Sequence, residues 1–588
     1  MWKKATPEGT KADSGKKPQH DGFRDTFESI VFAFLLALMF RTFEAEAFVI
    51  PTGSMAPTLY GRHKETICHE CGEAIVVGAS TELDREAGLL DSRVTSALCP
   101  NCGAENEQIY STLPFNGDRI LVNKYPYEFS TPSRWDVFVF KWPIDPQTNY
   151  IKRLVGLPGE TIRIRGGNVY LWDGTREEIL RKAPGKQRGL QMTVYDNSHV
   201  PERLLSAGWP ERWAAVEQLT NESQGVAGWQ ESKDSGWNFD AKSRTFTADT
   251  PTGDLQWIRY RHFFPTVDDW DAVDANLPVT PAARLVTDFC GYNAFTVDPP
   301  KPGETRSPRH IDTGPFWVGD LTLNCELKIT RADAGSELLL ELCEGTSWYR
   351  CRIDLSSGSA RLEEVNSQLN ERVKQLAAAE TSLKGPGTYR LSFANVDDRL
   401  CLWINDSLVS FGEGALITAH GATDNTLPTQ RDLTPVGIAL QGAAGTVSEL
   451  KLERDLYYRG TDNYGDDYFY AELIRLLDNP DAWGEAFQKV ARGHDTLELV
   501  IPDDHFLALG DNSPASSDSR MWPGQKTVPR EYLVGKAFFI YWPHGVPFLN
   551  GGQGFAISKH RNSDGSPSDY AKYSLPFYPQ FWRMHRIR

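Results

Sequence analysis

The chain has 588 residues, of which 40% are hydrophobic and 24% are charged, a composition typical of globular proteins that excludes a disordered chain. At about 150 residues per domain, this length predicts roughly three to four domains. The net charge of −16 and the pI near 5.3 argue against nucleic acid as a partner.

The chain begins with a basic tail over residues 1–22, followed by an apolar segment over residues 23–46. The uninterrupted apolar core of this segment, Ile30 to Phe40, is shorter than the ~20 residues that span a bilayer, so a spanning helix would be longer and tilted. A buried soluble helix and a cleaved signal peptide are the alternatives, but no small-residue cleavage site follows. We predict a membrane-anchor helix whose Lys-rich flank keeps the N-terminus cytoplasmic and places the rest of the chain outside.

The stretch "AFVIPTGSMAPTLYG", residues 47–61, follows the predicted anchor directly. Pro51 and Pro57 fix φ on either side of Ser54, and Gly53 permits a close backbone approach. A serine in so constrained a turn is either an ordinary turn residue or a displayed nucleophile.

Residues 62–108 form the first of two predicted insertions and contain the pairs "CHECG" and "CPNCG". Two C-x2-C pairs, each followed by glycine and separated by 27 residues, are typical of a zinc ribbon with four thiolate ligands: Cys68, Cys71, Cys99 and Cys102. Outside the cytoplasm, two disulfides are the alternative. We predict a structural zinc and no cofactor for catalysis.

Short apolar runs bounded by Gly, Pro or Asp predict strands over residues 109–172, including "WDVFVFKWP" and "NYIKRLVGL". Lys152 lies on the second of these runs, where burial would lower the pKa of its amine toward the roughly 7–8 of lysine bases. Arg153 alternates to the other face and cannot act as a base. Lys124 is a competing lysine, but its polar, turn-bounded surroundings predict solvent exposure.

The second and larger insertion comprises a linker over 173–224, a β-sandwich over 225–457 and a helical connector over 458–496. In "LTLNCELKI", the residues Leu321, Leu323, Cys325, Leu327 and Ile329 alternate onto one face, as in a half-buried strand. The runs "FANVDDRLCLWINDSLVSF" and "PVGIALQGAAGTVSELKLERD" resemble the late strands of concanavalin A-like jelly rolls. Jelly rolls often bind glycans, so we keep glycan binding and a purely structural cap as alternative roles for the sandwich.

The final segment, 497–588, contains "LGDNSPASSDSR" and ends in the aromatic and basic run "SLPFYPQFWRMHRIR". We expect that run either to contact the membrane interface or to pack as a tail.

Four stretches, "IPTGSMAPTL", "GDRILVNK", "YIKRLVGLPGE" and "LGDNSPASSDSR", occur in the order and with the content of type I signal peptidases, so the chain resembles a bacterial, membrane-anchored member of that family. The resemblance covers the anchor and about 200 residues of core, but neither insertion. It implies a mainly β chain in which an all-β catalytic core is interrupted by the zinc-ribbon-like segment and the sandwich. It also implies a serine endopeptidase with Ser54 as nucleophile and Lys152 as general base.

The same resemblance implies roles for further residues. The Thr52 hydroxyl would bind the oxyanion together with the Ser54 N–H, and the Ser516 hydroxyl, or that of Ser517, would orient the lysine amine. Trp135 stands where the family usually has glycine. The resemblance assigns structural positions near the site to Arg153, Asp511, Asn512 and the ion pair of Asp518 with Arg520.

The expected reaction is removal of signal peptides from exported preproteins after a small-x-small site, at the bacterial cytoplasmic membrane. The partners are then preproteins, the lipid bilayer and the protein export machinery. A self-cleaving Ser/Lys protease and a glycan-binding protein on a degenerate peptidase scaffold are the alternatives, and the presence of both dyad residues opposes the second of these.

Overall fold

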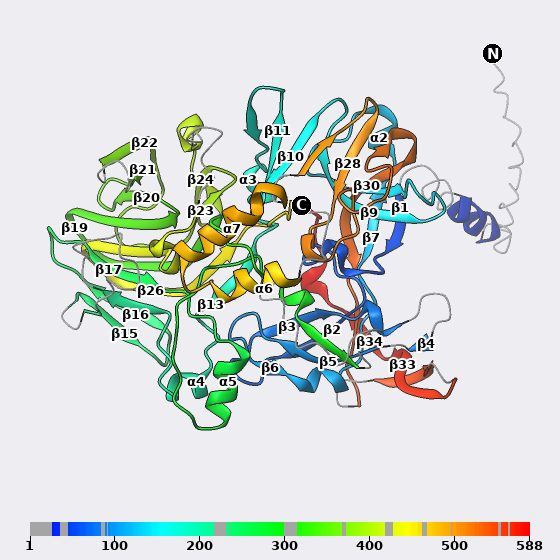
Figure 1. Cartoon of the computed structure of the whole chain (residues 1–588), viewed down its shortest axis with the longest axis horizontal. Coiled ribbons are helices and arrows are strands. Elements are labelled where there is room, and N and C mark those ends of the chain that lie inside the picture. The colour runs from blue at the N-terminus through cyan, green and yellow to red at the C-terminus, as the bar shows by residue number, and fades with distance from the viewer. Residues whose placement is uncertain are drawn as a thin grey trace, which may run out of the picture.

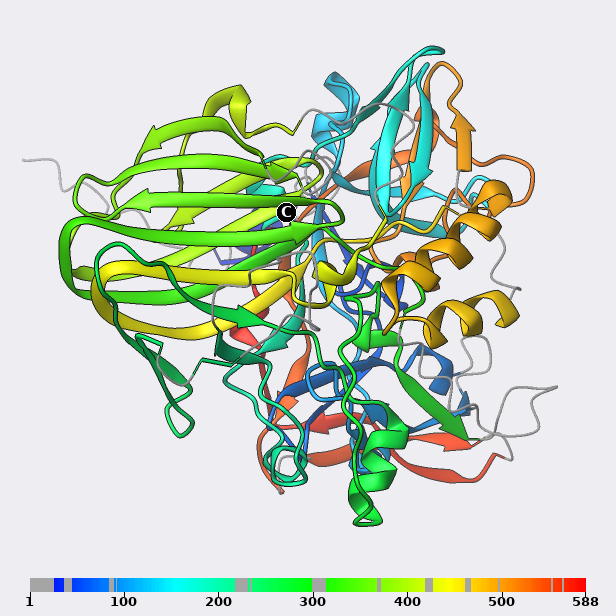
Figure 2. The same ribbon diagram turned by 60° about the vertical axis from the view of Figure 1, so that its left-hand side comes forward.

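The computed structural model describes residues 26–35, 45–83, 89–90, 92–216, 231–232, 235–298, 314–366, 372–417, 427–460, 467–494, 497–550, 554–562 and 565–588. The described chain is mainly β, as the sequence predicts, with strands in four regions: a core, a cysteine-containing unit, a large sandwich and a C-terminal extension. Figures 1 and 2 show the sandwich, in green and yellow, forming one side of the molecule and the core sheets forming the other.

The core is built from segments that are far apart in the sequence. Its seven-stranded sheet has the order β1 (Ala45–Val49), β7 (Arg119–Asn123), β30 (Leu533–Trp542), β8 (Val137–Lys141), β9 (Asn149–Gly156), β28 (His505–Leu509) and β29 (Val528–Pro529). A separate four-stranded sheet has the order β12 (Glu177–Ile179), β11 (Asn168–Trp172), β10 (Thr161–Arg165) and β27 (Leu497–Val500). The short helix α2 (Tyr125–Phe129) follows β7. The first and last parts of the chain therefore share one sheet across both insertions.

The cysteine-containing unit pairs β2 (His63–Ile67) with β3 (Ala74–Gly78), and it pairs β5 (Arg93–Leu98) with β6 (Glu105–Asn106). β18 (Phe295–Asp298) adds to β5. We predicted residues 225–457 to be sandwich throughout, and this strand differs from that prediction. It leaves the sandwich because Phe295 to Asp298 find their backbone partners on β5.

The sandwich strands are β13 (Met192–Asp196), β14 (Trp213–Val216), β15 (Trp237–Asp240), β16 (Thr245–Asp249), β17 (Gln256–Tyr260), β19 (Leu321–Glu344), β20 (Ser347–Asp354), β21 (Ser359–Asn366), β22 (Arg372–Glu380), β23 (Gly387–Val396), β24 (Arg399–Ile404), β25 (Ser407–Leu408) and β26 (Val436–Arg454). The alternation predicted for the first part of β19 is confirmed, since Leu321, Leu323, Cys325, Leu327 and Ile329 all lie in the main hydrophobic core.

The predicted linker over 173–224 is partly wrong, because β13 pairs with β26 and β14 pairs with β17. Tyr195 and Trp213, one from each of these strands, are buried in the sandwich core, and their burial explains why this segment joins the sandwich. The short helices α3 (Pro184–Gln187), α4 (Glu202–Ser206) and α5 (Val267–Asp274) lie on connecting segments.

The two helices of the connector, α6 (Asp467–Arg475) and α7 (Pro480–His494), lie between the end of the sandwich and β27 in the chain. Leu473 and Leu477 from the α6 end and Trp483 and Phe487 from α7 join the hydrophobic cluster that contains the four paired cysteines. The connector therefore packs against the cysteine-containing unit.

The C-terminal extension pairs β31 (Gly545–Pro547) with β34 (Phe577–Pro579), and β32 (Phe555–Asn562) with β33 (Pro567–Leu575). β32 also pairs in parallel with β4 (Leu89–Leu90), which joins the extension to the cysteine-containing unit. In the run at the end of the chain, Phe581 and Trp582 are 61% and 70% exposed, while the tip of the chain returns to the core, where Ile587 N donates to Phe538 O.

The anchor predicted over 23–46 lies partly outside the described residues. A helix covers residues 26–35, and the strand β1 already begins at Ala45, because Ala45 and Glu46 pair with Asn123 and Val122 on β7. Within the described parts of the chain, no helix has both the length and the apolar character needed to cross a bilayer.

Candidate active site and metal centre

Ser54 lies on the 3-10 turn η1 (Gly53–Met55), directly after β1. Met55 is fully buried in the core cluster with Ile50 and Leu59, and this packing fixes the turn against the sheet. The tight approach that we expected at Gly53 is present: a Cβ on Gly53 would lie 2.1 Å from Cε1 of Tyr292. Glycine is therefore required here because an aromatic ring covers the turn.

Lys152 lies on β9 and is 2% exposed, opposite Phe138 of β8. Its Nζ is 2.7 Å from Ser54 Oγ and 3.0 Å from the Ile151 carbonyl oxygen. Burial lowers the pKa of Lys152 to about 8, although the carboxylates of Asp518 and Asp511 act to raise it. A neutral amine in this position can accept the proton of the Ser54 hydroxyl while it donates to the Ile151 carbonyl.

Lys124, the competing lysine, pairs instead with Glu46 at 2.6 Å and keeps 30% of its side chain exposed. It lies on the connection between β7 and α2, and within the described chain its amine makes no hydrogen bond to Ser54. The two lysines therefore differ in burial and partner as the sequence predicts.

Arg153 points away from Lys152 and forms a bidentate ion pair with Asp511, with two N···O distances of 2.7 Å and both side chains fully buried. Asp511 also accepts from the Thr58 hydroxyl at 2.6 Å. This network ties β9, the segment after η1 and the loop after β28 together behind the dyad.

The loop after β28 holds the nucleophile turn through Asn512. Its backbone N–H donates to the Ser54 carbonyl oxygen at 3.1 Å, and its side-chain amide donates to the Gly53 carbonyl oxygen at 3.0 Å. Farther along this loop, Asp518 and Arg520 form a fully buried pair with contacts of 2.7 and 2.9 Å, and Asp518 also accepts from the Gly510 N–H.

Ser516 is 2% exposed and lies against Gly510, whereas Ser517 is exposed. Of the two serines, only Ser516 faces the interior beside the turn. Its hydroxyl has no hydrogen-bond partner among the described residues, so the bond to Lys152 that the resemblance implies is not formed in this structure. Thr52 precedes η1 in extended conformation, and its backbone packs against Gly61.

Two residues of the large insertion reach this site, and sequence reasoning missed both of them. Asn293 on η5 (Gly291–Asn293) exchanges two amide hydrogen bonds with Asn512, at 2.7 and 2.8 Å. Tyr292 covers Gly53 and stacks on Tyr60, with ring centroids 5.6 Å apart. No motif or spacing signals these contacts, because more than 200 residues separate η5 from both loops.

The four cysteines of the paired motifs converge in a buried cluster, with all four sulfur atoms within 4.8 Å of one another. Cys68 and Cys102 have Sγ atoms 3.6 Å apart, as do Cys71 and Cys99. A tetrahedral zinc–thiolate site with Zn–S bonds of about 2.3 Å has sulfur–sulfur edges of about 3.8 Å, while a disulfide bond is about 2.0 Å long. The cluster therefore fits four thiolates around a metal ion.

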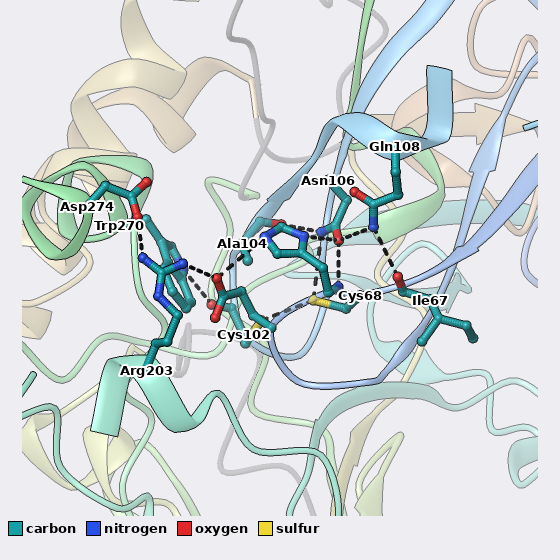
Figure 3. A network of polar contacts seen from close by, with 11 residues as sticks. Ile67, Cys68, Cys102, Ala104, Asn106, Gln108, Arg203, Trp270 and Asp274 are labelled. Atoms are coloured by element: carbon teal, nitrogen blue, oxygen red, sulfur yellow. Dashed lines mark hydrogen bonds and ion pairs between the residues drawn. The ribbon is translucent and has the colours of Figure 1, made fainter. Parts of the chain in front are cut away.

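Figure 3 shows the polar contacts that surround this cluster. Asn106 donates to Cys68 Sγ at 3.7 Å, and its carbonyl oxygen accepts from Gln108 at 2.9 Å. On the opposite side, Trp270 of α5 donates to the Cys102 carbonyl oxygen at 2.9 Å, and Arg203 of α4 pairs with Asp274 of α5 at 2.5 Å. The centre is thus held by residues of the large insertion as well as by its own two C-x2-C segments.

Comparison with known proteins finds similarity to signal peptidases in segments of the core. The profile of the family described as "Signal peptidase, peptidase S26" matches residues 93–220 and 457–542, a span that includes Lys152 and Ser516 but not Ser54. Signal peptidase I of Pseudomonas fluorescens is 40% identical over 83 residues, which are 12% of this chain and 28% of that protein. Signal peptidase I of Leptolyngbya laminosa is 38% identical over 101 residues, which are 16% of this chain and 49% of that protein.

The chain therefore spans about a quarter to a half of the length of these relatives. The matches to the peptidase S26 family and to signal peptidase I proteins support a serine peptidase, a hydrolase. Among solved structures, the carbohydrate binding module CBM66 from Bacillus subtilis covers 41% of this chain and 95% of its own length, at 11% identity and a TM-score of 0.22. That likeness is too low to support an argument about the sandwich.

Proposed function

We propose that this protein is a membrane-bound serine endopeptidase that removes signal peptides from exported preproteins through a dyad of Ser54 and Lys152. The observation that carries the proposal is the 2.7 Å contact between Ser54 Oγ and the buried Lys152 Nζ. Matches to bacterial signal peptidase I proteins support the substrate class.

The neutral Lys152 amine accepts the Ser54 proton as Oγ attacks the scissile carbonyl carbon. The Ser54 N–H and the Thr52 hydroxyl stabilise the oxyanion, a contribution of about 3–4 kcal/mol for each such donor in other enzymes. Protonated Lys152 then donates its proton to the leaving amine, and a water activated by the same amine hydrolyses the acyl-enzyme ester.

Small residues at the first and third positions before the cleaved bond are expected to fit shallow pockets beside the dyad, where bulky side chains would clash. The apolar N-terminal segment would anchor the enzyme at the bacterial cytoplasmic membrane, with the core outside the cytoplasm near the export machinery. We assign a structural zinc to the four cysteines. This ion would fix the fold of their unit, and no step of the reaction depends on it.

Cleavage of a preprotein with an Ala-x-Ala site, in detergent or liposomes, tests the proposal. Ser54→Ala and Lys152→Ala should each abolish cleavage, while Lys124→Ala, which removes a partly exposed lysine, should retain it. Retained activity in Lys152→Ala would refute the dyad, and cleavage at sites without small residues would refute the substrate class.

A further inference from the structure

Three metal-binding side chains converge outside both the dyad and the cysteine centre. His63 and Glu65 project from one face of β2, because alternate residues of a strand share a face. His544, which follows β30, meets them from the other end of the chain. The three ligand atoms lie within 4.8 Å of one another, and both imidazoles are buried, at 0% and 2% exposure.

The hydrogen bonding of these imidazoles is incomplete. His63 Nδ1 donates to the Gly61 carbonyl oxygen at 2.7 Å, which fixes the tautomer and leaves Nε2 with a free lone pair directed at the cluster. Nε2 of His63 and both ring nitrogens of His544 lack hydrogen bonds within the described chain. Buried polar atoms without partners destabilise a fold, so a ligand shared by these ring nitrogens would relieve that cost.

The distances match a shared metal ion better than hydrogen bonds. Glu65 Oε1 is 3.3 Å from His63 Nε2 and 3.6 Å from His544 Nε2, both longer than a normal N–H···O bond. Two ligands at about 2.0–2.1 Å from one tetrahedral ion are about 3.3–3.4 Å apart.

The surroundings resemble the outer shell of a metal site. The Gly61 carbonyl orients His63, and the ring of Phe115 stacks on His544 with centroids 4.3 Å apart. Gln580 contacts the second Glu65 oxygen at 3.5 Å, and its backbone N–H donates to the His544 carbonyl oxygen. Glu65 keeps 25% of its side chain exposed, which provides a route for an ion and a position for a water ligand.

We propose that His63, Glu65 and His544 form a second transition-metal site, with zinc as the expected ion, that clips β2 to the segment after β30. Two imidazoles and one carboxylate are a donor set that zinc accepts, with a water in the fourth position. Because Gly61 packs directly against Thr52, the clip would steady the backbone beside the nucleophile turn.

The test is the zinc content of the purified full-length chain, measured by mass spectrometry after removal of loosely bound metal. We expect two equivalents in the wild type. Glu65→Gln, which keeps the side-chain shape, and His544→Gln should each lose one equivalent, and Cys68→Ser should lose the other. His505→Gln is the matched control, because His505 bonds Thr527 in the core and should leave both equivalents in place.

Replacement of zinc by cobalt separates the two sites and verifies folding. The cysteine centre should give thiolate-to-cobalt charge-transfer absorption, and Glu65→Gln and His544→Gln should both retain it. The same two variants should lose the visible absorption of cobalt bound by the imidazole and carboxylate ligands. A single zinc equivalent in the wild type that disappears in Cys68→Ser, or two equivalents that survive both Glu65→Gln and His544→Gln, would overturn the proposal.

Discussion

At the scale of single residues, the proposed chemistry depends on the exclusion of water from the Lys152 amine. The amine lies on a buried strand. Two nearby acidic residues, Asp518 and Asp511, raise its pKa, while desolvation lowers it and is the larger influence. Both acids are themselves neutralised, Asp511 by Arg153 and Asp518 by Arg520. The two buried ion pairs therefore limit the negative potential at Lys152, and a proton acceptor becomes available near neutral pH.

Ser516 provides a test of lysine positioning. We expect Ser516→Ala to lower kcat about 10- to 100-fold, the effect of losing one hydrogen bond to a charged group in the transition state, with a smaller change in KM. The reason is that the buried Ser516 hydroxyl lies beside the turn and has no hydrogen-bond partner among the residues that the structure describes, so it is available to the lysine. Preprotein cleavage kinetics measure the effect.

Ser517→Ala is the control, because Ser517 is exposed one residue away, and it should behave as the wild type. Equal losses in both variants, or a loss confined to Ser517→Ala, would contradict the assignment of Ser516.

Trp135 occupies a backbone position that normally favours glycine. Glycine is usual there in the family that the chain resembles, and Trp135 has φ 69°, in the left-handed region that favours glycine. The tryptophan is buried, its carbonyl oxygen accepts from Arg153 at 2.7 Å, and its ring lies 5.1 Å from Lys182 Nζ. Packing and these contacts hold a conformation that the side chain alone would not favour.

At the scale of elements, the large insertion is structurally continuous with the active site. η5 delivers Tyr292 onto Gly53 and Asn293 onto Asn512, and Asn512 in turn holds the carbonyl oxygens of Gly53 and Ser54. The insertion thus supports the nucleophile turn directly through Tyr292 and indirectly through Asn512.

We therefore expect Asn293→Ala to reduce kcat about 10-fold with little effect on KM, because Asn512 would lose its reciprocal amide partner and hold the turn less rigidly. Steady-state cleavage kinetics provide the measurement. Asn238→Ala removes an exposed amide from β15 of the same insertion and should change neither constant. Wild-type kinetics in Asn293→Ala would show that the insertion does not support the turn.

Element assignment from sequence succeeded where alternation was strict and failed where tertiary pairing decided. The first part of β19 follows its pattern of two, and Leu321, Leu323, Cys325, Leu327 and Ile329 are buried as predicted. The segment "RLEEVNSQLNERVKQLAAAE" has helix-like spacing among strands, so the sequence leaves its element type open. Its described residues, 361–366 and 372–380, belong to β21 and β22, because each finds a neighbouring strand in the sandwich. β18 could not be predicted to leave the sandwich, since its partner β5 lies about 200 residues earlier.

At the scale of the whole molecule, the core could be predicted from short motifs because catalytic chemistry constrains which residues they contain. Those motifs bring Ser54, Lys152, Asn512 and Ser516 into one site although the sequence separates them by up to 462 residues. The architecture around the site could not be predicted, because the pairing of β32 with β4 and the packing of α6 and α7 on the cysteine centre depend on long-range contacts without local signals. Glycan binding and a structural cap remain alternative roles for the sandwich.

The measurement that tests the central claim most directly is the pH dependence of kcat/KM for cleavage of a preprotein. The free-enzyme profile reports the essential base, and Lys152 is active only when its amine is neutral. Because burial lowers the pKa of Lys152 to about 8, the rate should be low at pH 6, rise through pH 8 and level off above it. A profile that is already maximal at pH 6.5, or one that keeps the same rising limb in Lys152→Ala, would contradict the Ser54–Lys152 dyad.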